Sequence, residues 1–266
     1  MSDWSALNEA LKRLVNPATF PVAVSFNRKE GDIPPRARRP KRDLKAAIAP
    51  CMAAAMARRY GWTVALSKED VGCAIAANSY GWERIPSEDG AIAFLTYMQY
   101  AADAQAAREV LKGFRLLNGG EDLIVVYAPL GKADLEPDVV LLYVNPAQLM
   151  RLIHGATYRT GKAVESRFSG RAASCSEGVL GAYLDRNPKV VIPGNGDRVW
   201  GSCQDHEMAF ALPASGLEEV VEGLEKTHEK GIRYPIPTYL RYEPEVALSL
   251  PLADIFKTSE WVRLKK

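Results

Sequence analysis

The sequence predicts an α/β protein of the mixed α+β class, with one compact body of two related strand–helix halves around a mixed sheet. Short apolar runs alternate with amphipathic stretches, which is typical of buried strands covered by helices. Hydrophobic residues form 47% and charged residues 25% of the 266 residues, so a packed core is expected. We interpret residues 1–266 as a single domain with halves at about 21–130 and 137–237 and a C-terminal extension.

The predicted strands are short apolar segments bounded by polar residues, proline or glycine. The clearest is VVLLYV at residues 139–144, because an apolar run without alternation indicates a strand covered on both faces. The run LIVVYA at residues 123–128 is expected to pair with it across the short loop between them. The predicted strands are residues 21–26, 63–66, 91–97, 123–128, 139–144, 189–192, 207–212 and 245–250.

Helices are predicted where apolar residues recur at helical spacing. Asn145 can cap the helix that follows it, and Pro146 suits a first turn. For residues 44–60, either Pro50 kinks a helix capped by Asp43, or Pro50 forms the first turn of a shorter helix. The predicted helices are residues 2–15, 44–60, 103–114, 147–158 and 215–230.

The loop SGRAASCSEG begins at Ser169 and contains a helix start. Ser174 is a suitable N-cap with Glu177 three residues later, which is a capping-box pattern. Cys175 would then lie in the first turn, where backbone N–H groups and the helix dipole lower a thiol pKa and attract anions. A buried structural cysteine in a well-capped helix fits the same local sequence, and the local context alone favours neither interpretation.

A second glycine-bearing loop follows the strand at residues 189–192. Gly194 and Gly196 flank Asn195, and they permit left-handed backbone and the close approach of a ligand. A plain β-turn explains the Asn-Gly step equally well. Arg198 is placed to bind a carboxylate or phosphate, or to pair with Asp197 or Glu207. We expect residues 194–198 and 169–175 to face the same cavity.

The chain contains four cysteines, Cys51, Cys73, Cys175 and Cys203. If the helix begins at Pro50, Cys51 lies in its first turn, as Cys175 does in its own helix. Cys73 follows Gly72 in a segment that starts at Ser67, which has Asp70 three residues later. In a long chain that we place in the cytoplasm, such cysteines are reduced or metal-bound more often than paired in disulfides.

Composition also limits the partners. The net charge of +2 gives no general attraction to nucleic acid, and the proline-rich basic loop at residues 30–42 is interpreted as a solvated loop rather than a polyanion site. No apolar run approaches the length of a membrane span, and no signal sequence opens the chain, so a cytoplasmic protein is expected. No GxxxxGK[ST] motif occurs. A homo-oligomer is compatible with the sequence.

Three segments resemble the ArCR family, a domain of unknown function: VVLLYVNPAQLMRLI, FSGRAASCSEGV and VVIPGNGDRVWGSCQDHEMAFALP. The resemblance extends over about residues 21–237 and implies no established reaction. It does imply cysteines at recurrent positions, and hence an iron–sulfur cluster in at least some members. Cys51, Cys73 and Cys175 match those positions. The fourth cysteine is expected where this chain has Gly194, whereas Cys203 comes nine residues later.

Three hypotheses remain open, and the sequence does not decide whether the protein is an enzyme. In the first, Cys51, Cys73 and Cys175 bind an iron–sulfur cluster, with Cys203 or His206 as the fourth ligand, and the protein acts on a small metabolite.

In the second, a cluster-free enzyme binds a small anionic substrate. Cys175 is then a nucleophile or an anion contact, Arg171 and Arg198 hold a carboxylate or phosphate, and acid–base groups come from Asp205, His206 and Glu207. The third is a non-catalytic ligand-binding protein. The predicted ligand-binding residues are Ser169, Gly170, Arg171, Ser174, Gly194, Asn195 and Gly196.

Overall fold

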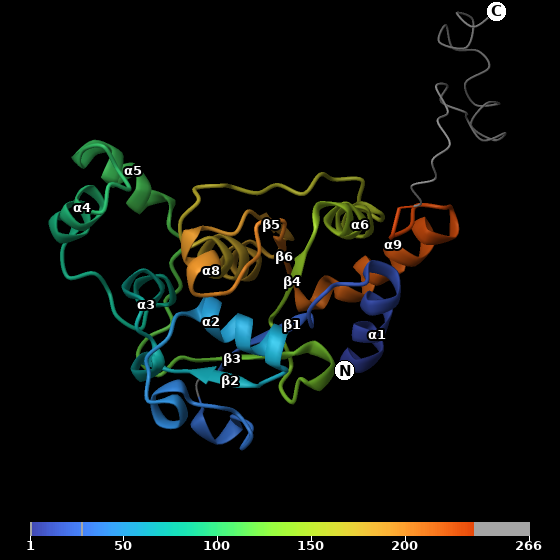
Figure 1. Cartoon of the computed structure of the whole chain (residues 1–266), viewed down its shortest axis with the longest axis horizontal. Coiled ribbons are helices and arrows are strands. Elements are labelled where there is room, and N and C mark those ends of the chain that lie inside the picture. The colour runs from blue at the N-terminus through green and yellow to red at the C-terminus, as the bar shows by residue number, and fades with distance from the viewer. Residues whose placement is uncertain (1, 28, 237–266) are drawn as a thin grey trace, which may run out of the picture. The chain divides into compact units, whose positions relative to one another are not determined.

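A six-stranded sheet with the order β2-β3-β1-β4-β6-β5 organises the fold (Figure 1). The computed structural model describes residues 2–27 and 29–236. All five pairings between these strands are antiparallel, and parallel pairing is limited to the isolated bridges Arg38–Val64 and Ile48–Val71. The strands are β1 Val22–Asn27, β2 Val64–Leu66, β3 Ile124–Pro129, β4 Val139–Val144, β5 Lys189–Val191 and β6 Met208–Pro213.

Strand β4 shows why the apolar runs form the centre of the sheet. Its side chains alternate between two cores, because successive residues of a strand point to opposite faces. Val139, Leu141 and Tyr143 enter one core. Val140, Leu142 and Val144 enter the other. The run therefore needs apolar residues at every position, as the sequence predicted.

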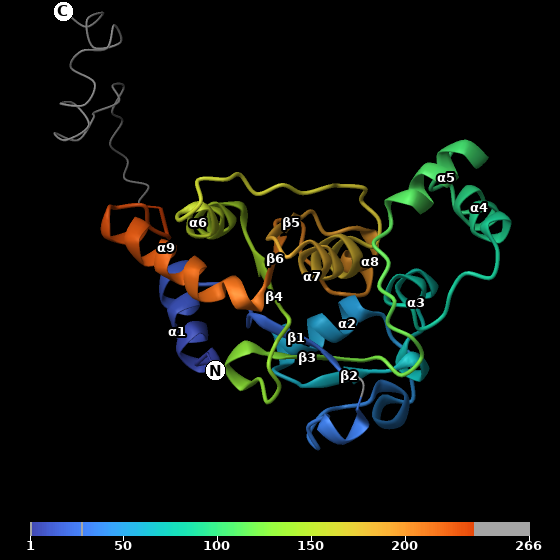
Figure 2. The same ribbon diagram turned by 180° about the vertical axis from the view of Figure 1, so that it is seen from behind.

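Helices cover both faces of the sheet (Figures 1 and 2). Helices α1, α6 and α9 share one core with the sheet, to which Leu11, Leu152 and Leu224 contribute. The opposite core lies under α2 and the π-helical segment Ala173–Leu180. The α-helices are α1 Trp4–Val15, α2 Pro50–Ala55, α3 Ala74–Tyr80, α4 Glu88–Tyr97, α5 Ala104–Gly113, α6 Pro146–Thr157, α7 Gly181–Asp185, α8 Asn195–Val199 and α9 Leu217–Glu229.

Helices α4 and α5 form a hairpin that stands apart from the sheet in both views (Figures 1 and 2). The hairpin has a small core of its own, formed by Ile92, Leu95, Ala101 and Ala107. The predicted strand at residues 91–97 is therefore wrong. Ser87 caps the helix by accepting a hydrogen bond from Gly90 N at 3.0 Å, and the buried positions follow helical spacing rather than alternation.

A second correction concerns strand pairing. Strands β3 and β4 do not pair with each other, because β1 lies between them and pairs with both. The loop that joins β3 to β4 thus crosses over a strand that comes from far earlier in the chain. A hairpin was the local expectation, and the long-range pairing of β1 overrides it. The predicted strand at residues 245–250 lies outside the described residues.

Several local predictions are confirmed. Asn145 and Gln148 form the capping box of α6, with Pro146 in the first turn. Helix α2 begins at Pro50, which was one of the two alternatives for residues 44–60. The α/β class of the mixed α+β type is confirmed, but the predicted mixed sheet is wrong, because all five strand pairings are antiparallel. The division into two related halves stays a prediction. In the part of the chain that is described, no helix combines the length and the apolar character needed to cross a membrane.

Candidate functional site

Three of the four cysteines line a single cavity of about 530 Å³. Cys51 lies in the first turn of α2, Cys73 is the N-cap of α3, and Cys175 lies in the first turn of the segment Ala173–Leu180. None of the thiols is in a disulfide. The three cysteines line the same cavity although 124 positions separate the first from the last (175 − 51), and their convergence on one cluster stays a prediction.

Backbone pairing places Cys51 beside Cys73. Ile48 N donates to Asp70 O at 2.8 Å, and Gly72 N donates to Ile48 O at 3.0 Å, so the two segments preceding these cysteines run side by side. A Cβ at position 72 would lie 3.2 Å from the carbonyl oxygen of Ala47. Glycine therefore lets the chains approach closely.

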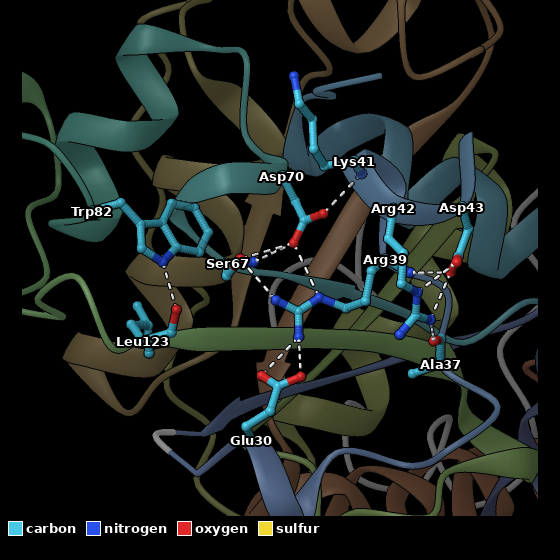
Figure 3. A network of polar contacts seen from close by, with 10 residues as sticks. All are labelled: Glu30, Ala37, Arg39, Lys41, Arg42, Asp43, Ser67, Asp70, Trp82 and Leu123. Carbon is cyan, nitrogen blue, oxygen red and sulfur yellow. Dashed lines mark hydrogen bonds and ion pairs between the residues drawn. The ribbon is translucent and has the colours of Figure 1, made fainter. Parts of the chain in front are cut away.

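A polar network holds this pairing in place (Figure 3). The buried Asp70 carboxylate accepts hydrogen bonds from Ser67 N at 3.0 Å, Lys41 N at 2.9 Å and Arg39 Nε at 3.1 Å. Arg39 also pairs with Glu30 at 2.7 Å. The Ser67–Asp70 capping pattern seen in the sequence is thus real. The chain's own carboxylates engage part of the basic loop at residues 30–42.

The two glycine-bearing loops meet at the cavity, as predicted. Residues 170–173 and 194–197 both line it. A Cβ at position 194 would lie only 2.8 Å from the carbonyl oxygen of Gly170, so this approach requires glycine at 194. Gly194 is the N-cap of the short helix α8, so of the two alternatives for this loop the plain turn is excluded. The π-helical segment Ala173–Leu180, which carries Cys175, has Ala172 as its N-cap, so Ser174 is not the N-cap.

Asp197 joins these loops, a role that the sequence interpretation missed. Its buried carboxylate accepts hydrogen bonds from Gly194 N at 2.9 Å and Ser174 N at 3.3 Å, and from the Ser174 hydroxyl. The spacing of three residues from Gly194 to Asp197 is a capping pattern, which could have indicated this role. We had considered Asp197 only as a partner for Arg198.

The electrostatic environment of the cavity opposes thiolate formation. Burial, followed by the nearby Asp197 carboxylate, raises the pKa of Cys51 to about 12. The same two causes raise the pKa of Cys175 well above its ordinary value. Of the two interpretations that the sequence left open for Cys175, the raised pKa favours the structural cysteine over a thiol activated by the helix start, because desolvation outweighs the helix dipole. These thiols are protonated at neutral pH in the ligand-free protein.

Cys203 occupies a different environment. It is buried, but it does not line the cavity. Burial, followed by Glu207, raises the pKa of Cys203 to about 12. Glu207 forms a buried ion pair with Arg58, with Nη–Oε distances of 2.6 and 2.9 Å, and the guanidinium lies 4.0 Å from the ring centroid of Tyr143. The Glu207 carboxylate is therefore occupied by Arg58.

Other predicted site residues also lie off the cavity. Arg198 donates to Gln204 O at 2.8 Å and lies 3.5 Å from Asp205. His206 is exposed, Ser169 donates its backbone N–H to Glu177, and Ser174 is buried against Asp197. The predicted residues that do line the cavity are Cys51, Cys73, Gly170, Arg171, Cys175, Gly194, Asn195 and Gly196.

The cysteines do not form a site for a single metal ion. Among the described residues, no three His, Cys, Asp or Glu side chains are grouped closely enough to hold one ion. Cys203 and His206, the predicted fourth ligands, lie away from the cavity. The four-residue ligand set therefore does not fit, and any group that reaches all three cavity thiols must be larger than one ion.

The outer wall of the cavity is apolar. Helix α4 and the residues after it contribute Phe94, Met98 and Tyr100, and Trp200 follows α8 on the other side. The sequence interpretation missed this wall because it read residues 91–97 as a strand. The cavity thus combines thiols and backbone with aromatic and methionine side chains.

Comparison with known proteins gives the chain's relationships. The model of the uncharacterised ArCR family matches residues 10–223. The chain belongs to the ArCR family. An uncharacterized protein of Methanocaldococcus jannaschii is 28% identical to this chain over 123 residues. The aligned residues cover 46% of this chain and 52% of that protein.

A second curated relative is a thymidylate kinase of Afipia carboxidovorans. It is 37% identical over 101 residues, which covers 34% of the ArCR protein and 42% of the kinase. The chain thus spans about half the length of the curated relatives it matches. No solved structure matches it. All the residues that line the cavity, from Ala47 to Trp200, fall inside the family match.

Proposed function

We propose that the ArCR protein binds an iron–sulfur cluster in this cavity through Cys51, Cys73 and Cys175. The observation that carries the proposal is that three free thiols from distant segments line one cavity, while the fourth thiol lies elsewhere. Thiolates are the usual protein ligands of such clusters, and their spacing in sequence matters less than their meeting in space.

The chemistry of the donor set supports a metal-containing group over a free nucleophile. A nucleophilic cysteine needs a thiolate near neutral pH, and the raised pKa of Cys175 opposes one. Metal binding deprotonates a coordinating thiol outright, so a high thiol pKa is no obstacle to it. Gly170 brings bare backbone to the wall, and nothing lies within 4 Å of the place where a Cβ would stand, which leaves room for a bulky group.

A cluster held by three cysteines supplies electron transfer or Lewis-acid chemistry when bound. The protein's part is to gather the thiols and to exclude water from them, which the apolar wall serves. Asp70 and Asp197 act as positioning residues, because each fixes the backbone that carries a ligand cysteine. A small metabolite would enter from the open, apolar side of the cavity.

Iron and acid-labile sulfide analysis of anaerobically purified protein tests the proposal. We expect iron and sulfide in the wild-type protein and their loss in Cys51→Ala, Cys73→Ala and Cys175→Ala. Cys203→Ala is the matched control, since Cys203 is buried as Cys51 is but lies off the cavity, and it should keep the iron. Circular dichroism checks that each variant is folded.

The outcomes separate the parts of the proposal. Iron-free wild-type protein, or equal loss of iron from Cys203→Ala, would refute the cluster. A different thiophilic metal without sulfide, lost from the same three variants, would refute the identity of the cofactor and keep the thiol site.

A further inference from the structure

We propose that the outer half of the cavity binds a monocarboxylate with an apolar, ring-sized body, whose carboxylate is held by Arg171. This inference names the class of the small metabolite and rests on the cavity proposed above as the functional site. It stands on side chains that are not cluster ligands: Phe94 and Met98 of the α4 region, Trp200 beside α8, and Arg171.

The apolar part of the ligand is indicated by the rim. Phe94, Met98 and Trp200 line the cavity, yet they remain 45%, 45% and 57% exposed. Single exposed apolar residues are ordinary, but several around one concave site indicate a binding surface. Leu95 and its neighbours already form the core of the α4–α5 hairpin. Phe94 and Met98 lie outside that core, and their cavity side is free to contact a ligand.

The charged part is indicated by Arg171. It is the sole Lys, Arg or His among the described residues that line the cavity, and it forms no ion pair within the described chain. Its guanidinium donates to the carbonyl oxygens of Tyr100 and, at 3.2 Å, Ser169. These two bonds use one N–H of each Nη atom and leave the second N–H of each unused. An arginine in an apolar cavity with no carboxylate in ion-pair contact is a ready partner for one.

The charge balance favours one carboxylate over a phosphate. A guanidinium presents a fork that matches a carboxylate with two hydrogen bonds. A doubly charged phosphate would need further cations, and the described lining offers none beside Arg171. Asp197, also in the wall, disfavours a second negative charge. A cavity of about 530 Å³ is in the range of sites for small organic molecules.

Calorimetric titration with matched probes tests the inference. The acids are 3-phenylpropionate, 4-phenylbutyrate and indole-3-propionate, each compared with its neutral amide, on the protein as isolated. We expect at least one acid to bind about tenfold or more tighter than its amide, since a hydrogen bond to a charged group contributes at least this much. Arg171→Met should remove the preference, and Phe94→Ala should weaken acid and amide alike.

Two further variants make the test specific. Arg159→Met removes an exposed arginine just after α6 that pairs with Glu222 and does not line the cavity, and it should keep the preference. Arg171→Lys keeps the charge but not the fork, so an intermediate preference is expected. Arg171→Lys also replaces Arg171→Met as the test variant if Arg171→Met does not fold.

Several results would overturn the inference: no binding of any probe, equal affinity of acid and amide, a preference that survives Arg171→Met, or stronger competition by inorganic phosphate than by acetate. Iron and sulfide are measured in the same samples. Arg171-dependent binding by iron-free protein would keep this inference and refute the cluster. Iron-loaded protein that binds no acid would keep the cluster and refute this inference.

Discussion

The cavity and the surroundings of Cys203 are two buried polar regions with opposite designs. Around Cys203, the Glu207 carboxylate is matched by Arg58, and both side chains are almost fully buried. In the cavity, Arg171 has no carboxylate in ion-pair contact among the described residues, and Asp197 is held by backbone N–H groups and a hydroxyl. One region pairs its buried charges with each other, although Arg58 Nε lacks a hydrogen-bond partner, whereas in the other Arg171 has no counter-charge in contact.

This difference shows how burial and cysteine content alone mislead. Cys51 and Cys203 both have a pKa raised to about 12, first by burial and then by a neighbouring carboxylate. Only the region around Cys51 opens onto a cavity with further thiols. A satisfied buried pair contributes to stability, and an unsatisfied concave site indicates binding. Variants that affect one region without the other test this distinction.

The largest expected effect is on the region around Cys203. Glu207→Ala leaves the Arg58 guanidinium buried without a counter-charge, so the free energy of unfolding should fall by about 3–5 kcal/mol. Urea denaturation measures it. The control is Glu222→Ala, which breaks an exposed pair with Arg159 and should cost far less because water screens it. Equal losses in the two variants would show that the Arg58–Glu207 pair is not a structural ion pair.

A smaller effect is expected where the two loops of the cavity meet. Gly194→Ala places a Cβ against the Gly170 backbone, at 2.8 Å from its carbonyl oxygen, and should lower the free energy of unfolding by roughly 1–3 kcal/mol. It should also reduce the iron content, because the loop carrying Cys175 is displaced. Gly31→Ala is the control, since a Cβ there meets nothing within 4 Å. A Gly194→Ala variant as stable as Gly31→Ala would contradict this loop contact.

The smallest expected effect is on the pKa of the thiols, and it distinguishes the Asp197 carboxylate from the Glu207 carboxylate. In metal-free protein, Asp197→Asn should lower the pKa of Cys51 below about 12 and leave Cys203 unchanged, because a nearby negative charge opposes thiolate formation. Glu207→Gln should lower the pKa of Cys203 and leave Cys51 unchanged. The rate of iodoacetamide alkylation of each cysteine, followed by mass spectrometry at alkaline pH, gives both values. A shift of both thiols in either variant would mean that the two regions are coupled.

Local features of the fold were readable from the sequence where the information is local. The cap of α6, the start of α2 at Pro50 and the buried strand β4 depend on neighbouring residues, and they agree with the structure. The pairing of β1 between β3 and β4 depends on contacts far apart in the chain, and it was missed. Residues 91–97 were misread because a short apolar run fits a helix and a strand alike.

The candidate site divides in the same way. The sequence by itself placed Cys175 in a first turn and offered a first turn for Cys51 as one of two alternatives, because proline and helical spacing act over a few positions. Only the tertiary structure decided that they share a cavity with Cys73 and Arg171, and that Cys203 does not. It also raised the pKa of Cys175, which favours the structural cysteine of the two interpretations. Burial comes from residues distant in sequence, and desolvation is stronger than the dipole of one helix turn.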